Sequence, residues 1–397
     1  MKILFLTTHN LATNPRIVKE IELALSKGHK VELICFEFDN WSSRLNEQLK
    51  TRFSNVKTHT INAGRNPLLP WFINVLAEKS NRFFGKIFSL RLAALSQAVS
   101  RRSNMLITKI ENVDSADFVI GHNPGALFPA YFAAKKFDCP MGFDVEDYHA
   151  GEGDNKFLQN LTRQLMLKLL PQMNYVSFAS LNIMQHVKQD SNIVTGNWFP
   201  VLNYFPAEEF SEPNSPNDGP VKMVWFSQNI NAGRGLEFIL PAVKRLKNEM
   251  ELHLIGNLNS DFYEKYLKNI SNIIIHPPMK QRDLHLGLEK FDIGLALEPA
   301  KDKNNELALS NKILACLQAG LYIVATNTAA QKSFLNELPG HGVCFDIKAD
   351  NADAIFEKIT GEINTIRNKK SMRYKNFETK NWETASIDLL KAWNKQA

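Results

Sequence analysis

The sequence is poor in cysteine and has no long apolar run. Its 397 residues include four cysteines with no Cys-x-x-Cys pair, and each cysteine lies in an apolar stretch. This scatter excludes a disulfide framework and a cysteine-based metal site, and it indicates buried, reduced thiols in a reducing compartment. No run approaches the roughly 20 apolar residues that a membrane-spanning helix needs. The four cysteines are Cys35, Cys139, Cys316 and Cys344.

The N-terminus lacks the pattern of a signal peptide. In MKILFLTTHN the apolar run is short, and no cleavage-site pattern follows it. The stretch is typical of a first β-strand. We therefore expect a cytoplasmic protein, which is compatible with a peripheral position at the inner face of the membrane.

Acidic residues are almost missing from 65–102. This segment has one acid, Glu78, and seven basic residues, so it carries the whole formal net charge of +6 and leaves the rest of the chain close to neutral. Basic residues mixed with aromatic ones at helical spacing are typical of a helix on an anionic membrane surface. The alternative is a solvated basic helix whose aromatic residues face the core. The aromatic residues are Trp71, Phe72, Phe83, Phe84 and Phe88.

The first half of the chain alternates short apolar runs with segments of helical periodicity. The runs are typical of buried strands, and helices are expected to begin near Pro15, Gly125 and Lys156. This alternation predicts a parallel sheet with helices on both faces. The expected strands are 2–8, 29–36, 116–123, 140–147 and 174–180.

The same alternation restarts after a proline-rich segment, PAEEFSEPNSPNDGP, which is residues 206–220. That composition cannot build a core and is typical of a linker. Six further strands are expected at 221–228, 250–257, 272–278, 292–299, 321–327 and 340–347. Helices between them are expected to begin near Gly235, Asp261, Lys280, Ser310 and Ala329.

We therefore predict an α/β protein with two doubly wound, Rossmann-like domains that face a cleft. A chain of this length with 44% hydrophobic residues is too long for one ordinary core. The first domain is expected at 1–205 and the second at 221–373. Residues 374–397 are expected to form a long amphipathic helix that lies across either domain, including a return to the first. Ligands in such sheets bind beyond the carboxyl ends of the strands, so the functional residues should follow each strand.

Polar residues follow three expected strands of the first domain. The loop THNLATNPR contains Asn10 and Asn14, which either cap a helix or place backbone amides in the cleft. A dense acidic cluster, FDVEDYHAGE, suits acid–base work or hydrogen bonds to sugar hydroxyls, because carboxylates are rarely buried without partners. The cluster could also hold a metal ion, but it contains only one histidine and no Asp-x-Asp triplet, which argues against a metal site. The candidates on these later loops are His122, Asn123, Asp144, Glu146, Asp147, His149 and Glu152.

The second domain offers two sites for phosphate groups. Gly233 and Gly235 flank Arg234 where a helix is expected, so free amides and a guanidinium would meet a diphosphate there. In ELALSNKILACLQAG, Ser310 and Asn311 can cap a helix while Lys312 reaches back towards its N-terminal end. Arg234 and Lys312 would then clamp two phosphates without a metal.

These motifs, in their order and spacing, resemble the GT-B nucleotide-sugar glycosyltransferases. Within them they are similar to the large retaining family that includes many bacterial lipopolysaccharide and exopolysaccharide enzymes. The resemblance covers nearly the whole chain and rests on ILFLTTHNLATNPRIVKE, FVIGHNPGALFPAYFAAKK, FDVEDYH, VWFSQNINAGRGLEFIL, LSNKILACLQAGLYIVAT and the terminal helix with Phe377 and Trp382. It implies a nucleotide-diphosphate sugar as donor, held by basic residues and helix amides without a metal ion.

The chain departs from the pattern of that family at several positions. Gln228 stands where relatives commonly have an arginine, and Arg234 stands at the lysine position. The glutamate that usually binds the donor ribose falls on Ala315. The resemblance implies that Glu298 faces the sugar, and Glu306 is the first candidate to replace the ribose contact, with Asn305 as the alternative. The usual histidine of an Asp-x-His-Glu run is Glu146 here, so Glu146 or His149 would line the acceptor side.

We therefore expect a retaining glycosyltransferase that acts on a glycan or lipid-linked glycan acceptor, with no nucleic acid as partner. Retaining enzymes of this kind lack an agreed protein nucleophile, so the resemblance implies leaving-group stabilisation by Arg234 and Lys312. Two alternatives stay open. A UDP-sugar 2-epimerase of the same architecture would use the acidic cluster and a histidine, and a non-catalytic sugar-binding protein would need only the two domains.

Overall fold

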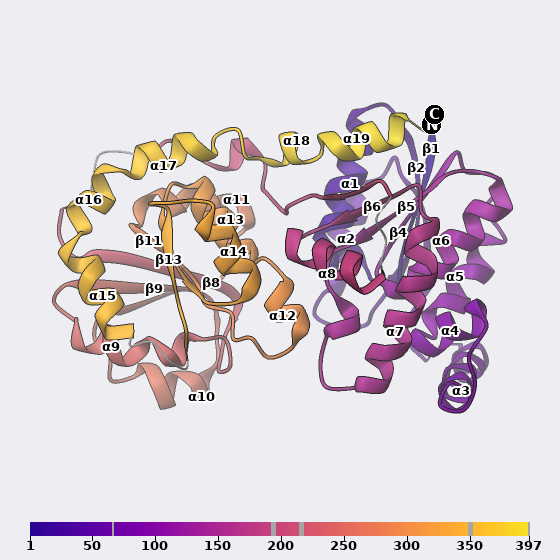
Figure 1. Ribbon diagram of the computed structural model, residues 1–397, viewed down its shortest axis with the longest axis horizontal. Helices are drawn as coiled ribbons and strands as arrows, with labels where there is room; N and C mark the ends of the chain where they lie inside the picture. Colours follow the sequence, from indigo (N-terminus) through magenta and orange to yellow (C-terminus); the bar gives the residue numbers. More distant parts are fainter. Residues whose placement is uncertain (66, 192–195, 214–217, 348–351, 396–397) are drawn as a thin grey trace. The chain divides into compact units, whose positions relative to one another are not determined.

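The chain divides into two compact units in a computed structural model that describes residues 1–65, 67–191, 196–213, 218–347 and 352–395 (Figure 1). Unit 1 contains residues 1–201 and the segment that begins at Ser386. Unit 2 contains Leu202–Ala385. The proposed linker at 206–220 therefore falls within unit 2, where Phe210 is buried beside Tyr204 and Phe205, and its residues 214–217 lie outside the described part of the chain.

Unit 1 is built on a parallel sheet whose described strands lie in the order β3-β2-β1-β4-β5-β6-β7. The five strands expected from the sequence are confirmed. Strands β3 and β7 were not expected, because β3 is an edge strand of mixed polarity, KTHTIN, and β7 has only three residues. The bounds are β1 Lys2–Thr7, β2 Lys30–Glu37, β3 Lys57–Asn62, β4 Phe118–His122, β5 Met141–Val145, β6 Tyr175–Phe178 and β7 Trp198–Pro200.

Three helices of unit 1 begin close to the positions expected from the sequence, and the starts of the other described helices were not predicted. Pro15 takes the first turn of α1 and Asn14 is its N-cap, with Oδ1 accepting from the Ile17 amide at 3.2 Å. The expected starts near Gly125 and Lys156 are confirmed by α6 and α7. The bounds are α1 Pro15–Ser26, α2 Ser43–Arg52, α3 Leu68–Phe84, α4 Leu92–Val99, α5 Arg102–Ile110, α6 Pro124–Phe137, α7 Lys156–Leu169 and α8 Leu181–Ser191.

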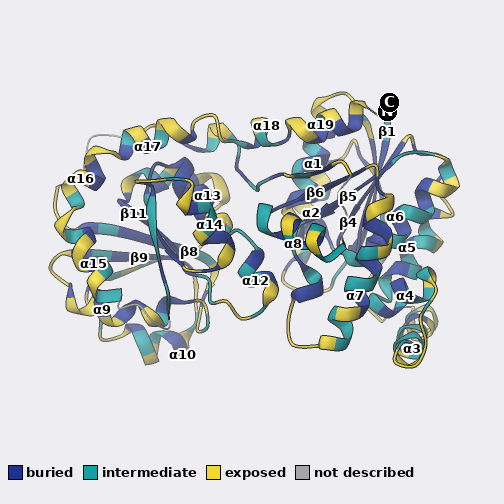
Figure 2. Cartoon of the chain, in the orientation of Figure 1, coloured by how far each residue is buried: buried dark blue, intermediate teal, exposed yellow. Residues whose placement is uncertain are grey.

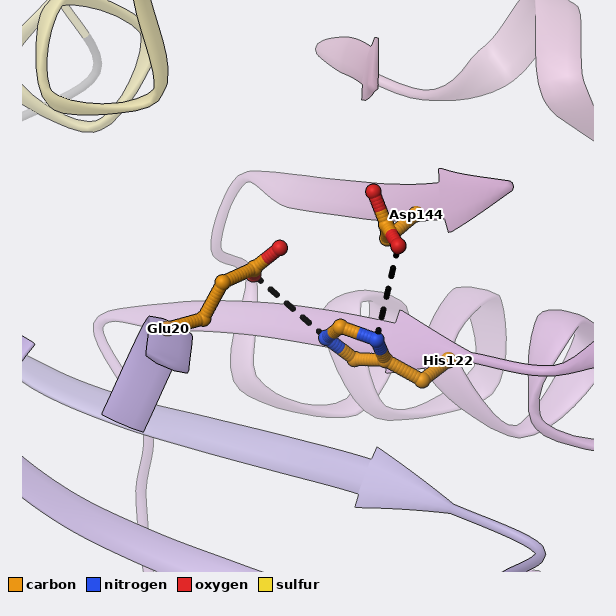
Figure 3. A group of neighbouring side chains, drawn as sticks. All are labelled: Glu20, His122 and Asp144. Carbon is orange, nitrogen blue, oxygen red and sulfur yellow. Dashed lines mark ion pairs between the residues drawn. The ribbon is translucent and has the colours of Figure 1, made fainter. Parts of the chain in front are cut away.

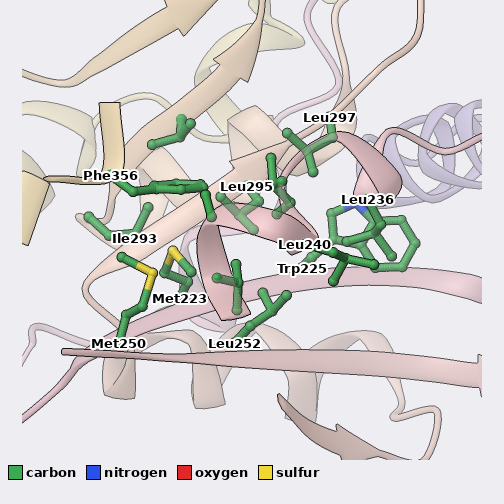
Figure 4. Close-up of a cluster of buried hydrophobic side chains, with 14 of the residues drawn as sticks. Met223, Trp225, Leu236, Leu240, Met250, Leu252, Ile293, Leu295, Leu297 and Phe356 are labelled. Atoms are coloured by element: carbon green, nitrogen blue, oxygen red, sulfur yellow. The ribbon is translucent and has the colours of Figure 1, made fainter. Parts of the chain in front are cut away.

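Unit 2 repeats this topology with described strands in the order β10-β9-β8-β11-β12-β13. All six expected strands are confirmed. Met223 and Trp225 on β8, Leu252 on β9 and Leu295 on β11 are buried together in the core that Figure 4 shows. The bounds are β8 Val221–Ile230, β9 Met250–Leu258, β10 Ile273–His276, β11 Ile293–Ala296, β12 Tyr322–Thr326 and β13 Gly342–Phe345.

The helices of unit 2 are short. Buried leucine and isoleucine side chains on α13 pack against the sheet, and α15 adds Phe356 to the core. The bounds are α9 Leu240–Arg245, α10 Ser260–Phe262, α11 Gln281–Gly287, α12 Lys303–Leu307, α13 Asn311–Gln318, α14 Ala329–Asn336, α15 Ala352–Gly361, α16 Ile363–Asn368, α17 Lys370–Phe377 and α18 Trp382–Ala385.

The expected long C-terminal helix is instead broken into α17, α18 and α19, which spans Ile387–Asn394. The break between α17 and α18 includes Asn381, whose side-chain oxygen accepts from the Thr384 amide at 3.0 Å, and the break between α18 and α19 lies at Ser386. Side chain to backbone bonds of this kind compete with a continuous helix. The α19 segment belongs to unit 1, where the Trp393 indole donates to the Tyr175 hydroxyl at 3.0 Å.

The cysteines are free thiols, as expected, but only two of the four are buried. Cys35 and Cys316 lie in the interior, and burial raises the pKa of each thiol to about 12. Cys139 and Cys344 are half-buried, with a pKa raised by burial to about 11. In the described part of the chain, no helix has the length and apolar character to cross a bilayer.

Candidate functional site

Each sheet has a switch point, where the strand order reverses and where ligands bind in doubly wound folds. In unit 2 the switch point lies between β8 and β11. The turn after β8 reaches it through two glycines with positive φ, Gly233 at 73° and Gly235 at 89°. A Cβ on Gly235 would lie 2.8 Å from the Cβ of Leu297, beyond the end of β11. Only glycine lets this turn approach the neighbouring chain so closely.

The turn gives less helix and fewer free amides than predicted. Gly235 precedes a 3₁₀ turn, Leu236–Phe238, and α9 begins only at Leu240. The Gly233 amide already donates to the Glu237 carboxylate. A turn of this length has little macrodipole, because the helix dipole comes from many aligned peptide groups. The Arg234 guanidinium is exposed and donates to the neutral Ser227 hydroxyl at 3.1 Å, so the charge at this turn comes from Arg234.

The first turn of α13 brings Ser310 and Lys312 to Glu298, which follows β11. The Lys312 Nζ lies 2.7 Å from Glu298 Oε1, and the Ser310 hydroxyl donates to the same oxygen at 3.0 Å. Ser310 therefore occupies the N-cap position of α13 without capping it through its side chain, contrary to prediction. Asn311 is exposed at the first helical position. The Lys312 ammonium also lies 5.8 Å from the centre of the Trp225 ring, on the face side that attracts cations.

Glu306 lies on α12 and contacts the start of α14. Its Oε2 accepts from the Ala329 amide at 3.0 Å, which satisfies one unpaired donor of that helix. Asn305 lies beside it, and its amide donates to Asp302 at 2.8 Å. Ala315 is fully buried in the core of unit 2. A carboxylate at position 315 would therefore stand among apolar side chains in this chain.

Lys301 is a third cation at this switch point, and the sequence interpretation missed it. A Cβ built on Gly233 would come within 3.1 Å of the Lys301 Nζ, so the ammonium lies beside the turn that carries Arg234. Lys301 is exposed. Among the described residues, neither Lys301 nor Arg234 forms an ion pair. The signal was available, since Lys301 follows Glu298 by three residues in the same strand-end loop.

The switch point of unit 1 is different, because its charged side chains are buried and paired with one another. The Arg16 guanidinium lies 3.2 Å from Asp144 and 3.3 Å from Glu20. His122 lies between the two carboxylates, with Nε2 at 3.4 Å from Glu20 and Nδ1 at 3.8 Å from Asp144, as Figure 3 shows. All four residues are at most 1% exposed. Burial alone would lower the pKa of His122, but attraction to Glu20 and Asp144 raises it.

His122 and Asp144 were predicted to be site residues at the ends of their strands, but both are buried in this cluster. Their polar atoms face Glu20 and Arg16 in the interior, because two carboxylates in a low dielectric need cationic partners. The atoms of Glu20, His122 and Asp144 lie within 4.8 Å of one another, close enough for a metal ion. Arg16 already pairs with both carboxylates, however, so a divalent ion would be placed close to a buried guanidinium.

The predicted asparagines of unit 1 are also buried. Asn10 caps a short turn and donates from Nδ2 to the Ser42 hydroxyl at 2.7 Å. Asn123 has a φ of 71° and accepts from the Thr7 hydroxyl at 2.7 Å, which links the ends of β4 and β1. Asn14 contributes its N-cap to α1. These side chains build the carboxyl edge of the sheet rather than extend beyond it.

The less buried part of the acidic cluster lies after β5, where Glu146, Asp147 and His149 are half-buried and Glu152 is exposed. Burial and the neighbouring Asp147 raise the pKa of the half-buried Glu146 to about 7. His149 Nδ1 lies 2.7 Å from Glu152 Oε2, and this bond with the surrounding acids raises its pKa despite burial. His9, which the sequence interpretation did not single out, follows β1. Burial and repulsion by His149 lower its pKa to about 4. Groups that titrate near neutrality or stay neutral suit proton transfer.

The chain shares its whole fold with solved glycosyltransferases, although the sequence matches no protein-family model and no curated protein. HepE from Anabaena, solved with UDP, is 12% identical with a TM-score of 0.65, and the match covers 100% of this chain and 99% of that one. Sucrose-phosphate synthase from Thermosynechococcus elongatus is 10% identical with a TM-score of 0.65 and the same coverage. The lipopolysaccharide outer core galactosyltransferase WaaB is 14% identical, with a TM-score of 0.62 and 100% coverage of both chains. The fold is therefore the GT-B fold of two parallel α/β domains.

Proposed function

We propose that the protein is a metal-independent, retaining glycosyltransferase that moves a sugar from a nucleotide-diphosphate sugar to a glycan or lipid-linked glycan acceptor. The observation that carries this proposal is the group of cations at the β8/β11 switch point. Arg234 and Lys301 come from two separate loops, and Lys312 comes from the first turn of α13, to one edge of the sheet. Solved proteins of the same fold bind nucleotides, and HepE was solved with UDP and with UDP-glucose.

The cations would stabilise the leaving diphosphate. As the bond to the sugar breaks, the diphosphate gains negative charge, and fixed cations lower the energy of that state. The Lys312 ammonium has three donors and uses one on Glu298, so the others can bind phosphate oxygens. Lys301 would supply the cation missing at Gln228. Glu298 is held by Lys312 and Ser310 and would face the sugar.

The ribose contact is proposed for Glu306. One of its oxygens accepts from the Ala329 amide, and a carboxylate has further lone pairs for a hydroxyl donor. Ala315 leaves this duty open because a methyl group accepts no hydrogen bond.

The acceptor is proposed to bind beside the partly exposed polar residues that follow β1 and β5 of unit 1. Glu146 titrates near neutrality and interacts with His149, which pairs with Glu152. Neutral His9 lies within electrostatic reach of that pair. Asp147 would add a further acceptor for sugar hydroxyls. These residues would orient the acceptor hydroxyl and receive its proton, since orientation can lower the barrier without a covalent intermediate on the protein.

A thermal-shift screen against UDP, GDP, ADP, TDP and CMP tests the donor site. We expect one nucleoside diphosphate to raise the unfolding temperature, UDP first among them. The shift should be lost in Arg234→Ala and kept in Arg245→Ala, which removes a unit 2 arginine paired with Asp353 and Glu357. If no nucleotide stabilises the protein, the donor site does not exist as proposed.

The choice between enzyme classes needs a product analysis. A 2-epimerase would change the sugar of the nucleotide donor with no acceptor present, whereas a transferase would leave that sugar unchanged and release the nucleoside diphosphate with an acceptor. A binding protein would do neither. Activity that disappears with a chelator and returns with manganese would contradict the metal-independent mechanism.

A further inference from the structure

Helix α3 packs against its neighbours α4 and α5 in unit 1 through its polar face. Asn74 accepts from the Asn104 amide on α5 at 3.1 Å, and Asn81 donates to Gln97 on α4 at 2.9 Å. Arg82 donates to the Ala98 carbonyl at 2.8 Å and pairs with Glu78. A surface helix of a globular protein normally turns its apolar stripe inwards. In α3 the inward side is instead a network of amides and a paired arginine.

The apolar side of α3 faces outwards, because its large apolar side chains are exposed. Figure 2 shows exposed positions along this helix. Positions 69, 72, 73, 76 and 83 share one helical face, and exposure along the patch runs from 49% at Phe84 to 69% at Leu69. The alternative that the aromatic residues face the core is therefore wrong for four of the five, since only Trp71 is half-buried. This apolar patch contains Leu68, Leu69, Phe72, Ile73, Leu76, Phe83, Phe84, Ile87 and Phe88.

Exposed cations accompany the apolar patch. Arg65, Lys79, Lys86 and Arg91 are exposed along the same segment, whereas its only acid, Glu78, is already paired with Arg82. Arg102 does not contribute, because its guanidinium turns inwards to the Thr8 carbonyl at 2.9 Å. The segment therefore presents large apolar side chains with unbalanced positive charge.

We propose that the α3 apolar patch and its cations bind an anionic lipid bilayer, with the aromatic and aliphatic side chains inserted at the level of the acyl chains. Helices of this composition lie in the membrane interface, where apolar insertion and attraction to anionic headgroups act together. A second copy of the chain is a poorer partner. In a two-fold dimer the patch would meet itself, and the cations of both copies would face one another. The proposal adds a site to unit 1 and does not depend on the transfer reaction.

Liposome flotation of the full chain tests this surface. Wild-type protein should float with vesicles of phosphatidylcholine and phosphatidylglycerol, and much less with phosphatidylcholine alone. The triple variant Phe72→Ser, Phe83→Ser, Phe88→Ser should lose flotation. The matched control Trp41→Ser removes an aromatic that is 67% exposed elsewhere in unit 1 and should float like wild type. Because all four side chains are exposed, unfolding temperatures should not change.

A charge variant separates the electrostatic part of the binding. Lys79→Glu, Lys86→Glu, Arg91→Glu should weaken binding to anionic vesicles by about fivefold or more for each reversed charge. Lys27→Glu, Lys135→Glu, Lys247→Glu changes net charge equally at exposed positions outside the segment and should bind like wild type.

Three results would overturn the proposal. The first is wild-type protein that floats with neither kind of vesicle, and the second is equal weakening by both charge variants. The third is a dimer in sedimentation velocity that the Phe-to-Ser changes abolish while no vesicle binds. Nucleotide binding in solution is measured separately, so failure here leaves the donor site untouched, and the reverse also holds.

Discussion

The two sheets have the same topology but use their switch points in opposite ways. In unit 1 the charged groups of Arg16, Glu20 and Asp144 are buried and paired with one another around His122. In unit 2 the cations Arg234 and Lys301 are exposed at the sheet edge. Charge at a switch point is therefore not by itself a sign of a ligand site. Burial and pairing decide whether a charged residue stabilises the fold or remains available to a ligand.

The sharpest test of this contrast replaces one arginine in each unit. Arg16→Met leaves two buried carboxylates without their cation and should lower the free energy of unfolding by about 3 to 5 kcal/mol. Arg234→Met removes an exposed group and should leave stability unchanged. Urea unfolding of both variants measures the difference. Equal stabilities of the two variants would mean that the buried cluster contributes no more to the free energy of unfolding than an exposed charge does.

The catalytic side of the contrast is tested at Arg234 and Lys312. Replacing either by Ala should lower turnover by on the order of a hundredfold or more, because each would stabilise the leaving diphosphate. Unfolding should stay close to wild type for Arg234→Ala. Steady-state rates with the nucleotide sugar found in the screen, compared with Arg245→Ala, measure the effect. Wild-type rates in both variants would remove the proposed clamp.

Glu146 lies between the buried, paired charges of unit 1 and the exposed cations of unit 2, since it is half-buried and titrates near neutrality. Its pKa is raised from 4.5 to about 7, so the folded protein holds the proton more tightly than the unfolded chain. Stability should therefore fall as the pH rises from about 4.5 to about 7. Glu146→Gln should remove this cost and raise stability at pH 8 by on the order of 1 to 3 kcal/mol.

Glu152 is a control for Glu146, because its pKa is shifted in the opposite direction. Its pKa is lowered, first by the hydrogen bond with His149, so its contribution is present above the unfolded pKa and is lost as the pH falls. Glu152→Gln should therefore lower stability near neutral pH. Thermal melts between pH 4 and pH 8 follow both variants. A Glu146→Gln protein with wild-type pH dependence would place the pKa of Glu146 in its ordinary range.

The smallest effect is expected at Lys301. Its ammonium is exposed, so Lys301→Ala should weaken nucleoside diphosphate binding by about tenfold at low salt, and by less as added salt screens the charge. Titration calorimetry at two salt concentrations measures both. Binding that is unchanged at low salt would exclude Lys301 as the replacement for the cation missing at Gln228.

The regular part of the fold was predictable because strands and helices leave local patterns. All six strands of unit 2 and the central five of unit 1 follow from apolar runs, and the first turn of α1 follows from Asn14 and Pro15. The short edge strand β7 has too few residues to leave such a pattern. The C-terminal segment has helical periodicity in its sequence, but side-chain bonds at Asn381 interrupt the helix itself.

The candidate sites were predictable only in part. Gly233, Gly235 and Arg234 were correctly grouped in one turn, but its short 3₁₀ geometry and the use of the Gly233 amide by Glu237 were not foreseen. Ser310 was expected to cap α13, whereas its hydroxyl binds Glu298. The roles of these residues towards a donor stay predictions until they are measured.

The sequence by itself determined the alternation of strands and helices, the two doubly wound halves and the unbalanced charge of 65–102. Those features depend on residues near one another in the chain. Only the tertiary structure decided that His122 is buried, that Lys301 reaches the Gly233 turn and that α3 turns its apolar side outwards. Each of these depends on a partner far along the sequence, as Arg16 and Asp144 do across 128 positions, and periodicity cannot indicate which partner a side chain will meet.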